Sequence, residues 1–190
     1  MNKTKTDNYT YPIVSYAVSM QDIPDHIAFV INIGNCSQGC KGCHSKDIMS
    51  DYWGEPPKEV PLKKVIKKAS KVHKLGASVC CIMGGTTNYG VTRESLTALI
   101  NALALIFEEG VGLYSGSDNA IDDNIDVEIY NYLPTDNNYY YAHHTNLTYL
   151  KIGSYQKLLG GLDKPTTNQR YYVKEEDGEW HDRTSLFTHK

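Results

Sequence analysis

The chain of 190 residues has no long apolar run, and this absence excludes whole classes of protein. A membrane-spanning helix needs about 20 consecutive apolar residues, and the sequence contains no such run. Residues 1–7 are polar and no apolar segment follows them, so the sequence does not predict a secretory signal. We therefore expect a cytoplasmic protein with no membrane partner.

Arginine is scarce, because only three of the 19 basic residues are arginine. Arginine is the side chain that reads bases and phosphates with two parallel hydrogen bonds, and the net charge of the chain is −3. Phenylalanine is equally rare, but 15 tyrosines supply aromatic mass for a core. We therefore expect a single globular domain over residues 1–190, with no nucleic-acid partner.

Apolar residues alternate between strand-like and helix-like spacing from residue 26 onward. The expected order is a strand (26–33), a helix (61–75), a strand (77–83), a helix (92–107), a strand (111–114), a weaker helix (121–129) and two strands (147–152 and 169–174). This alternation predicts an α/β fold whose parallel strands are joined by helices. Residues 1–24 are polar and turn-rich, and we expect an N-terminal extension with one extended segment.

Several candidate site residues follow predicted strands. They are a loop with three cysteines after the first strand, Gly84-Gly85 after the second, Ser115-Gly116 after the third and Lys151 to Gly153 at the end of the fourth. Ligands of parallel α/β sheets bind at the carboxyl ends of the strands. These segments, although distant in sequence, are therefore predicted to converge on one edge of the sheet.

The cysteines are unevenly placed. Cys36, Cys40 and Cys43 follow a C-x3-C-x2-C spacing, whereas Cys80 and Cys81 are adjacent in a predicted strand. Neighbouring residues of a strand face opposite sides, so we expect at least one of this pair in the core. Three soft thiolates suit an iron–sulfur cluster. A cubane cluster contains four irons, so three cysteines leave one iron open to a small molecule.

Other interpretations of the cysteine loop exist. Structural zinc takes four ligands, and His44 is available as the fourth, although adjacent side chains rarely reach one tetrahedron. Cys40 and Cys43 also have the spacing of a redox pair, but that motif requires a helix that begins at its first cysteine. The three thiols can also be unrelated buried residues. A zinc-binding interaction module without catalysis is therefore the alternative from a different class.

The sequence resembles the radical S-adenosylmethionine superfamily, and within it the activating proteins of anaerobic (class III) ribonucleoside-triphosphate reductase. The resemblance spans residues 27–180 and is carried by the cysteine motif, by Met83-Gly84-Gly85, by residues 113–116 and by residues 150–155, 159–162 and 166–170. It implies a partial, open (βα) barrel with a mostly parallel sheet. The family has an acidic residue where this chain has Thr86, so a carboxylate near the ligand's amino group is missing at that position.

The resemblance also implies the chemistry. Cys36, Cys40 and Cys43 would hold a 4Fe-4S cluster, and a flavodoxin-like or ferredoxin-like donor would reduce it. S-adenosylmethionine, cleaved at the cluster, would yield a radical that takes hydrogen from a glycine of the reductase. The implied cofactor-binding residues are Gly42, Met83, Gly84, Gly85, Ser115 and Lys151, with no catalytic side chain beyond the cluster ligands. Activation of another glycyl-radical enzyme and modification of a small molecule are alternatives within the same chemistry.

Overall fold

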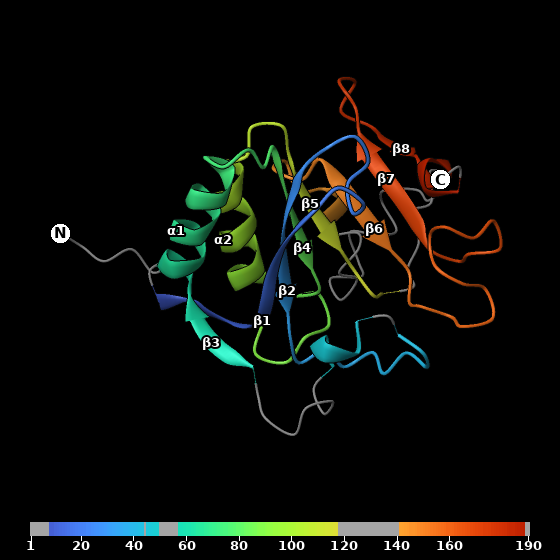
Figure 1. The fold of residues 1–190 in the computed structure, drawn as a ribbon, viewed down its shortest axis with the longest axis horizontal. Helices are drawn as coiled ribbons and strands as arrows, with labels where there is room; N and C mark the ends of the chain where they lie inside the picture. Colours follow the sequence, from blue (N-terminus) through green and yellow to red (C-terminus); the bar gives the residue numbers. More distant parts are fainter. Residues whose placement is uncertain (1–7, 44, 50–56, 118–140, 189–190) are drawn as a thin grey trace.

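The computed structural model describes residues 8–43, 45–49, 57–117 and 141–188 (Figure 1). These residues form one eight-stranded sheet with the strand order β3-β1-β2-β4-β5-β6-β7-β8. The strands are β1 (Thr10–Ser19), β2 (Ala28–Ile33), β3 (Lys58–Pro61), β4 (Val79–Met83), β5 (Val111–Tyr114), β6 (Tyr149–Ile152), β7 (Arg170–Lys174) and β8 (Trp180–Asp182). The helices are α1 (Leu62–His73) and α2 (Arg93–Ala104), with short 3-10 helices η2 (Lys46–Ile48) and η3 (Thr184–Phe187).

The sheet is mixed. Its four central strands, β2, β4, β5 and β6, are parallel, whereas the outer pairs on both sides are antiparallel. The expected parallel sheet therefore holds for the centre only. Helices α1 and α2 each lie between consecutive parallel strands, and such crossovers are what allow parallel pairing. The described sheet is open, and its membership of the (βα) barrel type stays a prediction.

Strand β1 lies inside the sheet, between β3 and β2. Its residues Tyr11 and Ile13 are buried in the main core, and the hydroxyl of Tyr11 donates to the carbonyl of Ser95 in α2 over 2.6 Å. Part of the segment expected as an extension is therefore a structural strand. Residues 1–7 and the weak helix expected over 121–129 lie outside the described residues.

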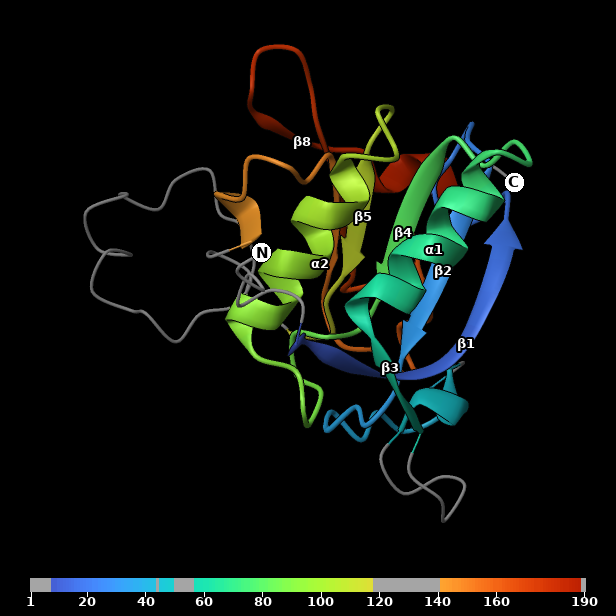
Figure 2. The ribbon, with the colours of Figure 1, turned by 90° about the vertical axis from the view of Figure 1, so that its left-hand side faces the viewer.

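Both α-helices cover the same face of the sheet, as Figure 2 shows. Helix α1 begins directly after Pro61 and ends before Gly76, as the sequence predicts, and its buried face carries Val65 and Ala69. Thr92 caps α2 through a reciprocal pair of hydrogen bonds with Ser95. Neither helix, nor any other in the described ranges, is long and apolar enough to cross a membrane.

The other face of the sheet carries a smaller core, which consists of Ile23, Ala28, Val30, Val79, Cys81, Tyr149 and Tyr171. Ile23 comes from the connection between β1 and β2 and is fully buried. A Cβ atom at Gly112 would lie 3.1 Å from Cδ1 of Ile23, so the glycine makes room for this side chain. The β1–β2 connection therefore covers the face of the sheet that the helices leave open. Cys80 belongs to the helix-side core and Cys81 to this one, which confirms the expected burial.

Candidate functional site

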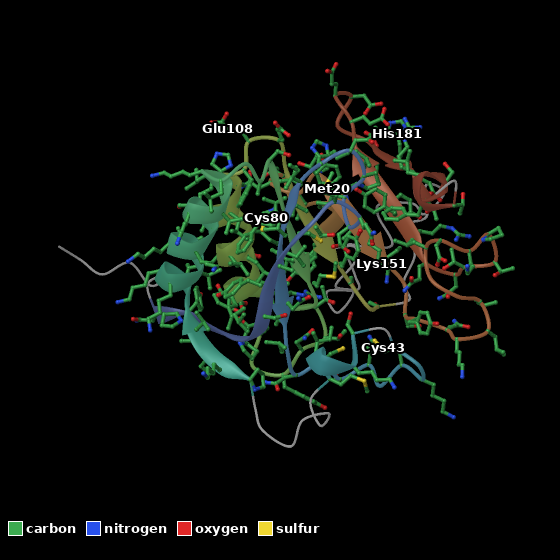
Figure 3. The ribbon with its side chains drawn as sticks, in the orientation of Figure 1. Met20, Cys43, Cys80, Glu108, Lys151 and His181 are labelled. Atoms are coloured by element: carbon green, nitrogen blue, oxygen red, sulfur yellow. The ribbon has the colours of Figure 1, made fainter. Side chains whose placement is uncertain are left out.

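A pocket of about 620 Å³ lies at the carboxyl ends of the parallel strands. This volume is typical of a small-molecule site. The predicted residues that line it are Cys36, Cys40, Cys43, Met83, Gly84, Ser115 and Lys151. Figure 3 shows two of them, Cys43 on the loop beneath the strands and Lys151 above it. The structure therefore brings together residues from four separate segments of the chain.

The cysteine loop is fixed to its surroundings by main-chain hydrogen bonds. The amide of Cys36 donates to the carbonyl of Ile48 over 2.8 Å, and that of Ser37 donates to the carbonyl of Thr87 over 3.1 Å. Within the loop, the amide of Cys43 donates to the carbonyl of Cys40 over 3.2 Å. These hydrogen bonds hold the loop in place. The three thiols are free and half-buried, and they are accessible from the pocket.

The thiols interact with one another and with one buried cation. Burial raises the pKa of the Cys43 thiol, and a backbone hydrogen bond from Ser45 lowers it in part. The charges of Cys40 and Cys36 raise it, and the charge of Lys151 has a smaller, lowering effect. Lys151 is 9% exposed, and its Nζ donates to the carbonyl of Gly153 over 2.7 Å. The pKa of Cys43 is raised on balance, so Lys151 offsets only part of the effect of burial.

The three thiols are of the donor type that iron–sulfur clusters take. Across the described ranges, no group of three or more histidine, cysteine or acidic side chains is arranged to hold a single metal ion. A cubane cluster binds each thiolate through a different iron, so its ligands need not converge on one point. Three thiols on one loop, facing one pocket, match that requirement. His44, the fourth ligand of the zinc alternative, lies outside the described residues.

The two glycines after β4, Gly84 and Gly85, lie in different surroundings, one at the pocket and one against α2. Gly84 lines the pocket with φ of 88°. Gly85 does not line it; a Cβ atom there would lie 3.1 Å from Leu96 of α2 and 3.2 Å from Ile33. With φ of 101°, Gly85 serves the close packing of the turn against α2. Of the two predicted residues, only Gly84 is therefore positioned to contact a ligand in this pocket.

Gly42 also lies outside the pocket lining. It is exposed, has φ of 75°, and a Cβ atom there would lie 3.4 Å from Cδ of Lys157. Its role in the structure is to let the cysteine loop turn between Cys40 and Cys43.

Asn88 stabilises the glycine turn, a role that no pattern in the sequence predicts. Its Oδ1 accepts from the amide of Gly85 over 2.7 Å. Its Nδ2 donates to the carbonyls of Ile33 over 2.9 Å and Gly34 over 2.7 Å. Asn88 is buried and also lines the pocket. One side chain thus connects the end of β2 to the turn after β4.

Ser115 and Thr86 form a hydroxyl pair at the ends of β5 and β4. Their oxygens lie 3.0 Å apart, and Ser115 is buried. The amide of Ser115 also donates to the carbonyl of Lys151 over 2.7 Å, which holds the ends of β5 and β6 together. Thr86 therefore brings a hydroxyl, and no carboxylate, to this end of the sheet.

The remaining walls come from segments that sequence reasoning did not assign to the site. Gln21 and Asp22 line the pocket from the β1–β2 connection, and Tyr155, Gly161, Leu162, Asp163 and Lys164 line it from the segment after β6. Gln169 lines it from the start of the segment that leads into β7. The hydroxyl of Tyr114 donates to the main-chain carbonyl of Asp22, which fastens the β1–β2 connection to β5.

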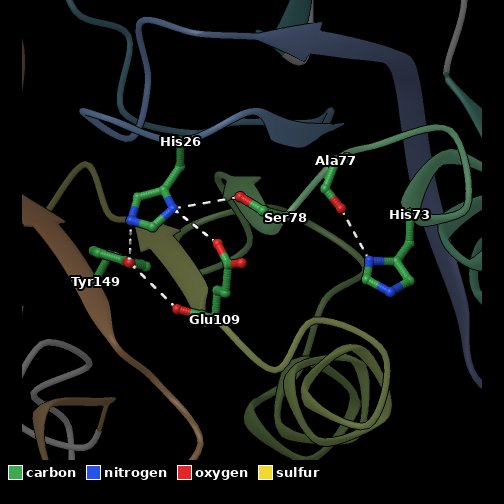
Figure 4. Close-up of polar contacts among 6 residues, drawn as sticks. All are labelled: His26, His73, Ala77, Ser78, Glu109 and Tyr149. Carbon is green, nitrogen blue, oxygen red and sulfur yellow. Dashed lines mark hydrogen bonds and ion pairs between the residues drawn. The ribbon is translucent and has the colours of Figure 1, made fainter.

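A second polar cluster, shown in Figure 4, lies at the opposite, amino-terminal ends of the strands. Nδ1 of His26 lies 3.3 Å from Oγ of Ser78 and 3.2 Å from Oε2 of Glu109. A catalytic relay of serine, histidine and acid needs the serine and the acid on opposite ring nitrogens. Here Ser78 and Glu109 both contact Nδ1 of His26, while Nε2 contacts the hydroxyl of Tyr149 over 3.0 Å. This cluster connects strand ends and does not have the geometry of a hydrolase.

The pocket with its cysteine loop is the site that combines reactive side chains with space for a ligand. No protein-family model matches the chain, and no curated protein or solved structure is significantly similar to it.

Proposed function

We propose that the protein is a radical S-adenosylmethionine activating enzyme that generates a glycyl radical on anaerobic ribonucleoside-triphosphate reductase. The observation that carries the proposal is the shared pocket. Cys36, Cys40 and Cys43 line it together with Gly84, Ser115 and Lys151. A C-x3-C-x2-C loop beside a pocket large enough for a nucleoside-sized ligand is the arrangement that this chemistry requires.

In this proposal Cys36, Cys40 and Cys43 hold a 4Fe-4S cluster. When bound and reduced by a flavodoxin-like or ferredoxin-like donor, the cluster supplies the electron that cleaves S-adenosylmethionine and starts the radical chemistry. The three thiols are free, which is the state that cluster assembly needs. The cytoplasm, where thiols stay reduced, is the compartment that suits such a site.

The chain's own residues bind and orient the ligand. Lys151 is a buried cation at the cysteine end of the pocket, so it suits the carboxylate of the ligand's methionine part. The carbonyls of Met83 and Gly84 are the acceptors proposed for its amino group, because Thr86 brings no carboxylate. Ser115 lies between Thr86 and Lys151 and is proposed to stabilise this end of the pocket.

The partner must bring its glycine to the pocket. An unguided radical would react with whatever it met, so the target has to be held at the open edge of the sheet. The hydrogen transfer is favourable, because a glycine radical is delocalised over two flanking amides. We therefore propose a transient complex in which a glycine loop of the reductase enters the pocket.

Reductive cleavage tests this function directly. The protein is purified anaerobically, loaded with iron and sulfide, reduced and mixed with S-adenosylmethionine without any partner. We expect slow formation of methionine and 5′-deoxyadenosine. Zinc-loaded protein is the control and should form neither product, because zinc has no accessible redox change. Absence of cleavage by fully iron-loaded, reduced protein would contradict the proposal and favour a zinc-binding interaction module.

A further inference from the structure

Two carboxylates line the pocket, and they differ in their partners. Asp163 lies 2.9 Å from Nζ of Lys164 and is largely exposed. Asp22 is half-buried, and among the residues that the structure describes its carboxylate accepts no hydrogen bond and pairs with no cation. A partly desolvated anion without a protein partner favours a positive charge on the ligand beside it.

The position of Asp22 is fixed by its own backbone. Its carbonyl accepts from the hydroxyl of Tyr114 at the end of β5, and the next residue, Ile23, fills the space over Gly112. Burial raises the pKa of Cys81, and the charge of Asp22 is the next cause. For Tyr114, burial raises the pKa first, then Cys81 and Tyr171, and Asp22 has the smallest effect. Asp22 therefore lies beside Tyr114, and Lys151 is the register partner of Tyr114 in the neighbouring strand β6.

We propose that the carboxylate of Asp22 binds the sulfonium charge of S-adenosylmethionine and thereby selects it over the uncharged thioether analogue, S-adenosylhomocysteine. This inference rests on the proposed function. In that function the amino and carboxylate groups of the ligand are held at the cysteine end, near Lys151. The next positive charge along the ligand is the sulfonium, so it is the one available to Asp22 and to the neighbouring ring of Tyr114.

The site also explains how the chain functions without an acidic residue at position 86. Thr86 is hydrogen-bonded to Ser115 and brings no charge to the pocket. Asp22 supplies a negative charge from a different part of the chain, the connection between β1 and β2.

The experiment compares two ligands on one variant. Isothermal titration calorimetry measures the affinity of iron-loaded, unreduced protein for S-adenosylmethionine and for S-adenosylhomocysteine. Asp22→Asn keeps the shape of the side chain and the carbonyl that binds Tyr114, so the fold should be retained. We expect Asp22→Asn to bind S-adenosylmethionine about tenfold more weakly and S-adenosylhomocysteine within about twofold of wild type.

Asp25→Asn is the matched control. Asp25 belongs to the same connection, is exposed, lies outside this pocket and has φ of 66°, a conformation that asparagine adopts readily. Asp25→Asn removes the same charge, so it should leave the affinities for S-adenosylmethionine and S-adenosylhomocysteine unchanged. An equal loss for both ligands in Asp22→Asn, or no loss, would overturn the role of Asp22 while the proposed function stands. Wild-type protein that binds neither ligand would overturn both.

Discussion

Nδ2 of Asn88 lies 2.7 Å from the carbonyl oxygen of Gly34, and this hydrogen bond joins the two loops that form the pocket. Gly34 follows β2 and leads into the cysteine loop, whereas Asn88 belongs to the turn after β4. The same amide group also bonds to Gly85 and Ile33. The relative position of the cysteines and the glycine turn therefore depends on one buried side chain.

Asn88→Ala should lower the free energy of unfolding by about 3 kcal/mol, because it leaves the buried amide of Gly85 and the carbonyls of Ile33 and Gly34 without a partner. Urea unfolding of the cluster-free protein measures the effect. Asn101→Ala removes an amide that bonds to Asn146 on the surface, and it should change stability by less than about 0.5 kcal/mol. Equal losses in the two variants would contradict the assigned role of Asn88.

Gly85→Ala should destabilise the protein more than Gly90→Ala. Both glycines have positive φ, of 101° and 85°, so alanine at either position brings a backbone cost of about 1–2 kcal/mol. Only at Gly85 would the new Cβ atom crowd Leu96 and Ile33; at Gly90 it would meet open space. We expect an additional cost of about 1–3 kcal/mol at Gly85, measured by urea unfolding. The packing explanation fails if the two variants are equally stable.

Much of this arrangement could be predicted from local sequence. Pro61 and Gly76 mark the ends of α1, Thr92 caps α2, and β5 has the bounds that its apolar run predicts. These features depend on neighbouring residues, so a single sequence contains the information. The convergence of the cysteines with Ser115 and Lys151 follows from one further rule, that ligands bind at the carboxyl ends of parallel strands.

The rest depends on contacts between distant segments. Strand β3 is short and half-exposed, so its pattern carries no strand signal, and it forms because it pairs with β1. Asp22 reaches the pocket because Ile23 packs over Gly112 and Tyr114 bonds to the Asp22 carbonyl, and both contacts join residues far apart in sequence. The sequence places Gly85 beside the cofactor, whereas in the folded chain it packs against Leu96 and lies outside the pocket lining.

Alkaline pH should destabilise the protein through Tyr149. Burial, and then the charge of Glu109, raises the pKa of Tyr149 from the usual 10 to about 12. Below pH 10 both folded and unfolded chains keep this proton, so the stability that Tyr149 contributes is fully present. Between pH 10 and 12 the unfolded chain loses the proton first, so stability falls as the pH rises.

Replacement of Tyr149 by Phe should therefore reduce the loss of unfolding free energy with pH in this window, by up to about 1.4 kcal/mol per pH unit. Urea titrations at several pH values above 9 measure the slope. Tyr89→Phe, at an exposed position, is the control and should leave the slope unchanged. An unaltered slope in Tyr149→Phe would show that other groups carry the alkaline transition.

Each of the three single replacements by Ala, at Cys36, Cys40 or Cys43, should abolish bound 4Fe-4S iron, because a site with one open iron has no spare protein ligand. Iron and acid-labile sulfide are measured after anaerobic reconstitution. Cys80→Ala and Cys81→Ala are the controls and should keep the cluster, because both thiols are buried in the cores on either side of β4. Loss of the cluster in a control while Cys36→Ala retains it would contradict the ligand assignment.

Electron paramagnetic resonance tests directly whether this protein installs a glycyl radical on a partner. Anaerobic ribonucleoside-triphosphate reductase is incubated with the iron-loaded protein, S-adenosylmethionine and a reductant. We predict a doublet signal on the reductase, which disappears when the target glycine is replaced by alanine. A reductase that gains nucleotide-reducing activity without this signal would contradict the account.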